Sequence, residues 1–474
     1  MTESTTWKSG GVTVASWSYS YDGAGRLTSV TNSFGETTSY AYDSEGKLLT
    51  QSNQNGTMLT YGYNQARGWP TSVLYALSGT PFASYSLNYD QGANTVGNLT
   101  NVSELDGSAQ VFTYDDLDRL TAEARTGTVP FTRSYAYDLA NNVTQADSTA
   151  FATYDAGNKI LGLTGGTISF YGNGRLTSLS HPTIGNGSFI WNSSDKMTSQ
   201  TVSGVTSTYK YDHRGLRLAS YQGSESQWVY YIFSGDSLIG EVRASGEQKA
   251  FTWGADGIVS IRNVTAGNSR WLHYGPQGEA RYLTDASGAI TDSYNYSAYG
   301  VVTSSTGSSY NPFRYGGKVG YYSYGGLILA GQRWYHPGLM RWLSRDPILY
   351  DGGDNVYAYV EGNPVGWVDP DGLAPVKNMT DRPIIIGGNK GAIKGKGPQI
   401  PDIRLNPGER CSLLSPKRGV RDVDAIDGND DGVADVGDMA EKVPGTSFTN
   451  GWVPGYVEVV CKKGSYGPGC EITW

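Results

Sequence analysis

Short segments in which hydrophobic and polar residues alternate follow one another along most of the chain. Ser39-Tyr40-Ala41-Tyr42 is one example, with an aromatic ring at every second position, the spacing of a strand that turns its rings to one face. It leads into Asp43-Ser44-Glu45-Gly46, where the glycine permits a positive φ. Leu48 and the residues after it then alternate again. The pattern predicts a β-hairpin that turns at Asp-x-x-Gly.

This unit is repeated. Copies stand at Tyr21-Asp22, Tyr42-Asp43, Tyr114-Asp115, Tyr137-Asp138, Tyr154-Asp155 and Tyr211-Asp212, with degenerate forms at Tyr171-Gly172 and Trp191-Asn192. Apart from the stretch between Tyr42 and Tyr114, the neighbouring copies named here lie about 17 to 23 residues apart, a spacing typical of structural repeats. One hairpin cannot bury its own apolar face, so we expect the units to stack on one another, with tyrosines as the packing side chains. We therefore expect structural roles for these tyrosines and aspartates.

Composition agrees with a mainly β fold. The chain has 474 residues, 64 of them glycine, and its 35 tyrosines outnumber the 11 phenylalanines and 12 tryptophans together. Only 17% of the residues are charged, which is typical of short strands joined by tight turns rather than of helices. The length is enough for a large repeat body and a small extra domain.

Charge and targeting signals exclude some classes of function. The net charge is −8 with no long basic run, so no nucleic-acid-binding face is expected. The apolar stretches are too short to span a bilayer. Met1-Thr2-Glu3-Ser4 lacks the basic and apolar pattern of a signal peptide. Either export is unconventional or Met1 is not the start of the natural polypeptide, and we favour the second because the repeats begin almost at once.

The array of Tyr-Asp/Gly units resembles the RHS/YD-repeat family, which includes bacterial polymorphic toxins, the C components of insecticidal toxin complexes, and teneurins. The resemblance covers about residues 10–373. It implies a mainly β fold in which YD-repeat hairpins form a spiralling, partial, cocoon-like β-sheet shell around a hollow interior. It also predicts three domains: a repeat shell over 1–270, a core over 271–373 and a small β-rich C-terminal domain over 374–474.

Many short motifs follow one another from Trp271 onward and resemble the RHS repeat-associated core. They are Tyr274-Gly275-Pro276, Phe313-Arg314-Tyr315-Gly316-Gly317, Gln332-Arg333-Trp334-Tyr335, Ser344-Arg345-Asp346-Pro347, Asn363-Pro364 and Asp369-Pro370-Asp371-Gly372-Leu373. The resemblance implies that the core cleaves its own chain after the last motif, between Leu373 and Ala374. It also implies that Arg333, Asp346 and Asp369 do so as a single-turnover aspartyl-type autoprotease without a cofactor.

The residue types suit this chemistry. Hydrolysis of a peptide bond needs a base to activate water and an acid to protonate the leaving amine, and two neighbouring carboxylates that share one proton can do both. A cation such as Arg333 can hold one aspartate ionised or stabilise an oxyanion. The other interpretation is that Asp346 and Asp369, each of which precedes a proline, only make turns. Asp371, two residues further on, is an alternative candidate for the catalytic role assigned to Asp369.

Departures from the family pattern stand in the core: Leu339-Met340-Arg341-Trp342 replaces the usual Gly-Arg-Phe, and two further changes accompany it. His336 replaces the acidic residue of the usual Arg-Tyr-Tyr-Asp-Pro motif, a change expected to affect local packing and to lower the efficiency of cleavage. Gly325-Gly326-Leu327 replaces the commoner Thr-Gly-Leu. None of these changes removes a proposed catalytic residue.

Residues 374–474 contain no histidine and no recognisable active site. Residues 427–438 have the spacing of a twelve-residue calcium loop, with Gly432 at the sixth position. Its expected Ca²⁺ ligands are Asp427, Asn429, Asp431, Asp435 and Asp438. A solvated Asp/Gly turn is the alternative, because the flanks are poor helices. Cys461 and Cys470 suit a disulfide that leaves Cys411 unpaired, or all three are plain thiols.

Together these features predict the C-terminal part of a secreted or cell-surface bacterial protein. Its shell would enclose a variable effector and release it by self-cleavage after Leu373. Expected partners are its own N-terminal repeats or a companion shell protein, a secretion machinery and a target cell. Two alternatives stay open: a non-enzymatic adhesion protein with an inert core and a calcium-stabilised interaction domain, and a tail whose toxin site is not recognisable.

Overall fold

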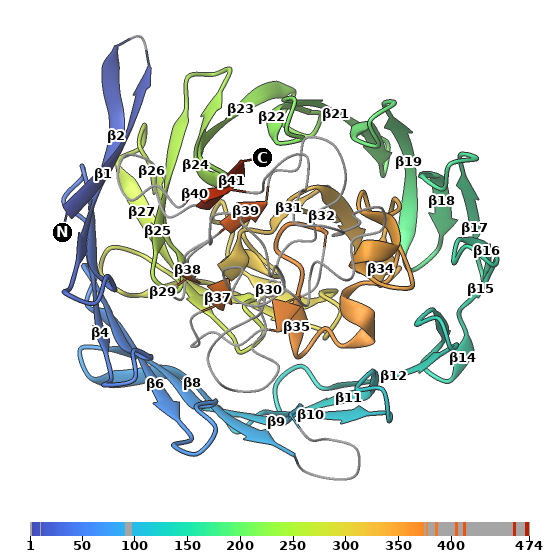
Figure 1. The fold of residues 1–474 in the computed structure, drawn as a ribbon, viewed down its shortest axis with the longest axis horizontal. Coiled ribbons are helices and arrows are strands. Elements are labelled where there is room, and N and C mark those ends of the chain that lie inside the picture. The colour runs from blue at the N-terminus through green and yellow to red at the C-terminus, as the bar shows by residue number, and fades with distance from the viewer. Residues whose placement is uncertain are drawn as a thin grey trace, which may run out of the picture.

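The computed structural model describes residues 2–9, 11–90 and 97–373, with the backbone alone at residues 351–352 and in six short strands beyond residue 375. Strands dominate, and the described residues contain no α-helix, only three short 3₁₀ turns. The strands stand side by side in a broad ring (Figure 1). The mainly β, spiralling fold predicted from the repeats is therefore confirmed.

Two antiparallel sheets of fourteen strands each make up this ring, and in both sheets every strand pairs with its neighbours in sequence. The strands of the first sheet are β1 (Thr2–Ser9), β2 (Val12–Tyr21), β3 (Leu27–Asn32), β4 (Thr37–Tyr42), β5 (Leu48–Asn53), β6 (Thr57–Tyr63), β7 (Pro70–Leu77), β8 (Thr80–Tyr89), β9 (Leu99–Glu104), β10 (Ala109–Tyr114), β11 (Leu120–Thr126), β12 (Phe131–Tyr137), β13 (Val143–Ala146) and β14 (Thr149–Ala150). A hairpin of β15 (Ala152–Tyr154) and β16 (Ile160–Leu163) links it to the second sheet.

The second sheet continues the same meander from residue 167 to residue 306. Its strands are β17 (Thr167–Phe170), β18 (Leu176–His181), β19 (Gly185–Trp191), β20 (Met197–Val202), β21 (Val205–Tyr211), β22 (Arg217–Gln222), β23 (Gln227–Ser234), β24 (Ser237–Arg243), β25 (Gln248–Gly254), β26 (Gly257–Asn263), β27 (Asn268–Tyr274), β28 (Ala280–Thr284), β29 (Ile290–Tyr296) and β30 (Val302–Thr306). The boundary predicted after residue 270 falls within β27, and the division into domains stays a prediction.

Each Tyr-Asp turn is organised by its aspartate. Asp22 Oδ1 accepts hydrogen bonds from the amides of Ala24 and Arg26 at 2.9 Å, and its Oδ2 pairs with the Arg26 side chain at 2.7 Å. Gly25 adopts a φ of +82°, a conformation that costs glycine least. The Arg26 guanidinium also lies over the ring of Tyr42, 4.9 Å from its centroid. One aspartate thus closes the hairpin and aligns it with the next.

The tyrosines join neighbouring hairpins through their hydroxyl groups. Tyr42 donates to the carbonyl of Leu27 and Tyr63 to that of Leu48, both at 2.7 Å. In the degenerate repeat, Trp191 donates its indole N–H to a carbonyl in the same way, also at 2.7 Å. The structure therefore explains why large residues with a polar tip are preferred here. The aromatic group packs between neighbouring hairpins, while its hydroxyl or N–H satisfies a buried carbonyl.

The two sheets complete one turn of a spiral, and the second packs against the start of the first. Trp17 Nε1 donates to Thr252 Oγ1 at 3.2 Å, and the Tyr61 hydroxyl donates to Asp256 Oδ2 at 2.6 Å. Figure 1 shows β25 to β27 beside the N-terminal strands, and β25 contacts β3 directly. This overlap closes the ring.

An inner segment follows the second sheet and lies within the ring in Figure 1. Its elements are the 3₁₀ turns η1 (Gly317–Val319), η2 (Leu349–Gly352) and η3 (Val360–Gly362), a four-stranded sheet of β31 (Tyr322–Tyr324), β32 (Leu327–Ala330), β33 (Arg333–His336) and β34 (Arg341–Trp342), and β35 (Trp367–Val368) paired with β36 (Val376–Lys377). The side chains of β32, β33 and β34 are all buried.

The inner segment is attached to the edge of the ring that carries the Tyr-Asp turns. Asn363 Nδ2 donates to Asn98 Oδ1 at 3.1 Å, and the Tyr357 hydroxyl donates to the carbonyl of Gly174 at 2.8 Å. Asn355 and Arg341 donate further bonds to Asn142 and Asn158 on the same edge, and Lys196 of that edge donates to Gln332 of the inner segment. The turns of many repeats thus hold one compact body across one rim of the shell.

The described part of the chain has no helix long and apolar enough to cross a membrane. Beyond residue 377, the remaining strands are β37 (Ile384–Ile386), β38 (Ile403–Leu405), β39 (Cys411–Leu413), β40 (Glu458–Val460) and β41 (Cys470–Thr473). The predicted calcium loop and Cys461 lie outside the described residues, so those predictions are untested.

Candidate functional site

Arg333 begins β33 and points its guanidinium into the inner segment. The residue is only 3% exposed, and the plane of the guanidinium lies over the ring of Trp342, 4.2 Å from its centroid. Its Nη1 also approaches the carbonyl of Val356 at 3.5 Å. A buried cation needs a compensating charge, so the groups around Arg333 decide what this site can do.

Asp346 lies in the turn after β34 and is buried to the same degree, at 3% exposure. Its Oδ1 accepts a hydrogen bond of 2.9 Å from the amide of Ile348, and its carbonyl accepts the amide of Leu349 at 3.0 Å. Its Oδ2 pairs with Arg333 Nη1 at 2.8 Å. Asp346 therefore makes the turn expected of an Asp-Pro pair and a buried ion pair as well.

Asp369 follows β35 and is 1% exposed. Its Oδ2 pairs with Arg333 Nη2 at 2.8 Å, while its Oδ1 accepts the amide of Leu373 at 2.9 Å. The Tyr321 hydroxyl holds its backbone, donating to the Asp369 carbonyl at 2.8 Å and accepting from the Asp369 amide at 2.9 Å. The carboxyl group thus lies between the arginine and the end of the terminal motif.

Two turns, one at Gly331 and one at Gly372, pack closely against each other and bring the terminal motif to Arg333. The amide of Gln332 donates to the carbonyl of Asp371 at 2.8 Å. Gly372 has a φ of +67°, and a Cβ there would collide with the carbonyl of Ala330. Gly331 fits against Asp371 in the same way. The glycine of Asp-Pro-x-Gly-Leu is therefore required by both its backbone conformation and this contact.

Arg333 bridges the two aspartates, with one nitrogen on each. If both carboxylates were ionised, the buried trio would hold a net charge of −1, which is costly where water is excluded. Burial raises the pKa of Asp369, and the charge of Asp371 adds to the rise, whereas Arg333 and the Leu373 amide oppose it. The raised pKa of Asp369 makes this carboxyl group suited to hold a proton.

The structure thus brings together Arg333, Asp346, Asp369 and Leu373, four of the residues predicted for the site. Ala374, on the other side of the predicted scissile bond, lies outside the described residues. Sequence reasoning missed Tyr321, whose only signal is its place in the dense run of core motifs. Asp371 takes part through its carbonyl, which accepts the Gln332 amide, and through its charge.

His336 lies at the end of β33 and caps the following turn. Its Nδ1 accepts the amide of Leu339 at 3.3 Å. Burial lowers the pKa of His336 to about 4, so the imidazole is neutral near pH 7. No contact with Arg333, Asp346 or Asp369 is among its hydrogen bonds, which places its role in local packing. Its expected effect on cleavage efficiency stays a prediction.

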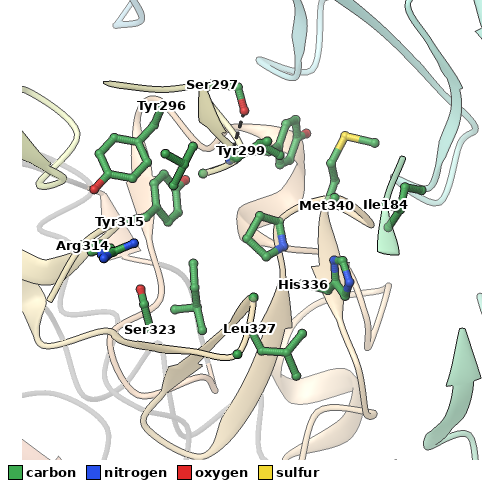
Figure 2. Close-up of a pocket in the computed structure, with 18 of the residues that line it drawn as sticks. Ile184, Tyr296, Ser297, Tyr299, Arg314, Tyr315, Ser323, Leu327, His336 and Met340 are labelled. Atoms are coloured by element: carbon green, nitrogen blue, oxygen red, sulfur yellow. Dashed lines mark hydrogen bonds between the residues drawn. The ribbon is translucent and has the colours of Figure 1, made fainter. Parts of the chain in front are cut away.

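The described residues contain no group of three or more histidine, cysteine or acidic side chains that could hold a metal ion. A separate cavity of about 820 Å³ lies between the ring and the inner segment. Figure 2 shows His336, Met340 and Ile184 on one side of it, with Arg314, Tyr315 and Ser323 on the other. Arg333, Asp346 and Asp369 do not line it, so the buried trio is a distinct site.

Comparison with known proteins connects the fold to a family. Residues 75–361, more than half of the chain, match the family model Teneurin YD-shell, and residues 9–37 and 21–53 match the RHS Repeat model. The chain is 31% identical over 281 residues to the tRNA3(Ser)-specific nuclease WapA of Bacillus spizizenii, covering 55% of this chain and 12% of the nuclease.

Two further relatives are toxins by name. The chain is 27% identical to the double-stranded DNA deaminase toxin A of Burkholderia cenocepacia, over 60% of this chain and 22% of the toxin. It is 26% identical to the toxin subunit YenC2 of Yersinia entomophaga, over 52% of this chain and 29% of the subunit. The chain thus spans less than a third of the length of each of these relatives.

Solved structures share the fold. The Photorhabdus luminescens Tc holotoxin pore with a mutation in TccC3 matches with a TM-score of 0.60 at 19% identity, over 76% of this chain and 21% of that chain. The TcdB2-TccC3-Cdc42 crystal structure matches with a TM-score of 0.55 at 18% identity, over 76% of this chain and 22% of that chain. From its repeats, its shell fold and the family match, the chain belongs to the RHS/YD-repeat proteins with a Teneurin YD-shell.

Proposed function

We propose that this chain is the C-terminal part of a bacterial RHS-repeat toxin whose inner segment cleaves the bond between Leu373 and Ala374. The observation that carries the proposal is the bridge from Arg333 to Asp346 and Asp369, at 2.8 Å on each side, together with the hydrogen bond from the Leu373 amide to Asp369. Burying charged groups this deeply costs folding free energy. Cleavage of the Leu373–Ala374 bond would account for their place beside the terminal motif.

In this proposal Asp346, ionised and paired with Arg333, takes a proton from a water molecule as the water oxygen attacks the carbonyl carbon of Leu373. Arg333 balances the negative charge that develops on the carbonyl oxygen. The C–N bond then breaks, and Asp369 gives its proton to the nitrogen of Ala374. The products are a carboxyl group on Leu373, which gains the water oxygen and its remaining proton, and an amino group on Ala374, which gains the proton of Asp369, while the other water proton stays on Asp346.

Two features support these roles. The raised pKa of Asp369 favours the protonated form that a general acid needs. Arg333 Nε is buried and has no hydrogen-bond partner among the described residues. A buried donor without a partner costs free energy, so Arg333 has a donor available for an oxygen atom of the substrate or of water.

The released segment, residues 374–474, would be a variable effector enclosed by the shell. The relatives named above are a tRNA nuclease, a DNA deaminase toxin and a toxin subunit, which favours a toxic cargo without identifying it. The TcdB2-TccC3-Cdc42 crystal structure contains TcdB2 beside TccC3, which favours a companion shell protein as partner here. Location outside the producing cell, by secretion or at its surface, belongs to the same proposal.

Denaturing gel electrophoresis of the purified full chain tests this function. The wild-type protein should separate into two fragments on either side of residue 373, and Asp346→Asn should give one full-length band while keeping the folded ring. A matched control is Asp236→Asn, which replaces a half-exposed aspartate on the shell. A single full-length band for the wild type would favour the alternative of an inert, adhesive repeat protein.

A further inference from the structure

The fifth position of the repeat turn is usually a cation paired with the turn's own aspartate. Arg26 pairs with Asp22 at 2.7 Å and Lys159 pairs with Asp155 at 3.4 Å, in each case four residues apart. These pairs are half-exposed and close the turn on itself. Lys196 occupies the same position in the repeat that begins at Trp191.

In that repeat the aspartate is replaced by Asn192, whose side chain has no charge. Asn192 Oδ1 still accepts the amides of Ser194 and Lys196 at 3.0 Å, so the turn keeps its shape. The ammonium group of Lys196 instead reaches into the inner segment. It donates to the carbonyl of Gln332 at 3.2 Å and to the side-chain oxygen of the same residue. The departure from the motif thus frees one shell cation for the inner segment.

The next repeat holds Gln332 from the other side. Gln332 Nε2 donates to the carbonyl of Arg214 at 3.1 Å. A Cβ on Gly215 would collide with the side chains of both Gln332 and Lys196. The position equivalent to Lys196 is Leu216 in this repeat. Two successive repeats therefore form a socket for one residue of the inner segment.

Gln332 is the chain neighbour of Arg333 and binds the carbonyl of Asp371 through its amide at 2.8 Å. The residue on the other side, Trp334, donates its indole N–H to the hydroxyl of Tyr211, a shell residue, at 3.2 Å. Both neighbours of Arg333 are thus held by the shell. Displacement of a catalytic group by about 1 Å can cost on the order of a hundredfold in rate.

We infer that Lys196 is a positioning residue contributed by the shell, which fixes Arg333 through Gln332 and so makes cleavage depend on closure of these repeats around the inner segment. The inference rests on the proposed function. Lys196 does not contact the carboxylates; it acts on the Gln332 turn that holds both Arg333 and Asp371. Cleavage then follows assembly of the shell and does not occur in a chain whose repeats are still unpaired.

The charges around Lys196 agree with this role. Its pKa is lowered to about 8, first by burial and then by the positive charge of Arg333, against the opposing effect of Asp195 and Asp212. Two cations so close are tolerated because Asp346 and Asp369 pair with Arg333. The ammonium group of Lys196 is therefore held here against both burial and the neighbouring charge of Arg333.

The test follows cleavage with time in the full chain, pulse-labelled during cell-free translation and separated on denaturing gels. Lys196→Met, which keeps the length and removes the donor, should slow cleavage at least about tenfold. Lys196→Arg, which restores a donor and a charge, should recover most of the rate. Lys159→Met is the matched control at the same repeat position away from the site, and it should cleave at the wild-type rate.

Melting temperatures of the same variants separate positioning from stability. Lys196→Met and Lys159→Met should lose similar, small amounts of thermal stability, while only the first loses cleavage rate. If Lys196→Met is cut as fast as wild type, or if both variants slow in proportion to their lost stability, the inference is wrong. Asp346→Asn in the same series reports on the proposed function and should stay uncut. An uncut wild type would overturn both the proposed function and the inference about Lys196. A cut wild type with an unaffected Lys196→Met overturns the inference alone.

Discussion

The amide of Leu373 donates a hydrogen bond of 2.9 Å to Asp369 Oδ1, while the other oxygen of the same carboxyl group binds Arg333 at 2.8 Å. One side chain thus connects the end of the terminal motif to the buried cation. Because the Gly372 turn makes this contact possible, the motif is both the proposed substrate and part of the site that acts on it.

Arg333→Lys tests whether the fork of the guanidinium is required. A lysine keeps the charge but offers one point donor, and it cannot bind Asp346 and Asp369 through two fixed nitrogens. We expect cleavage to slow on the order of a hundredfold or more, as measured by the fraction of full-length chain over time on a denaturing gel. Unchanged cleavage would show that charge alone is enough.

Tyr321→Phe removes the hydroxyl that donates to the Asp369 carbonyl and accepts from its amide. Losing these buried bonds should cost about 1 to 3 kcal/mol of unfolding free energy and slow cleavage, because the Asp369 backbone is no longer held. Chemical denaturation and the gel assay measure the two effects. Tyr296→Phe is the control, since that buried hydroxyl has no hydrogen-bond partner among the described residues.

The regular parts of the fold could be predicted from sequence because they depend on local signals. The Asp22 turn and the Tyr42 strand use contacts within one repeat or between neighbours, so their pattern is visible in any single copy. The overlap of the spiral could not be predicted, because Trp17 and Thr252 come together only through the accumulated curvature of the strands between them.

The candidate site also has residues that can be predicted from the sequence and residues that cannot. Arg333, Asp346 and Asp369 were predicted through resemblance to a family, since no periodicity relates three residues that lie on a strand, in a loop and after another strand. Tyr321 acts through its hydroxyl and Gln332 through its backbone amide. Neither role can be recognised from the residue type alone. The replacement of aspartate by Asn192 was visible as a degenerate repeat, but its consequence for Lys196 needed the structure.

Glu123, on β11, joins the first sheet to the turn after β29 and should make stability depend on pH. It accepts the Tyr135 hydroxyl at 2.7 Å and the Ala298 amide at 2.8 Å, and burial raises the pKa of Glu123 to about 7. The folded chain therefore holds this proton more tightly than the unfolded chain. The stability it contributes is present below the ordinary pKa of about 4.5 and is lost as the pH rises through about 7.

Glu123→Gln, which cannot ionise, should remove this dependence. Relative to the variant, the wild type should lose up to ~3 kcal/mol of unfolding free energy between about pH 5 and about pH 8. Denaturant titrations of both proteins at the two pH values measure the difference. A difference that does not change with pH would show that Glu123 is not held protonated by burial.

The calcium loop at residues 427–438 is a separate proposal. If Asp427, Asn429, Asp431, Asp435 and Asp438 bind Ca²⁺, a hundredfold excess over the dissociation constant should stabilise the C-terminal segment by about 2.7 kcal/mol. Differential scanning calorimetry with Ca²⁺ or with a chelator measures this. Asp427→Ala should abolish the shift, and an unchanged wild-type transition would favour the solvated turn.

The most direct test of the central proposal is intact-mass analysis of the purified full chain under denaturing conditions. We expect two masses, one for a fragment that ends at Leu373 and one for a fragment that begins at Ala374, and a single full-length mass for Asp369→Asn. A wild-type chain that keeps its full mass, or one that is cut at another bond, would contradict the proposal.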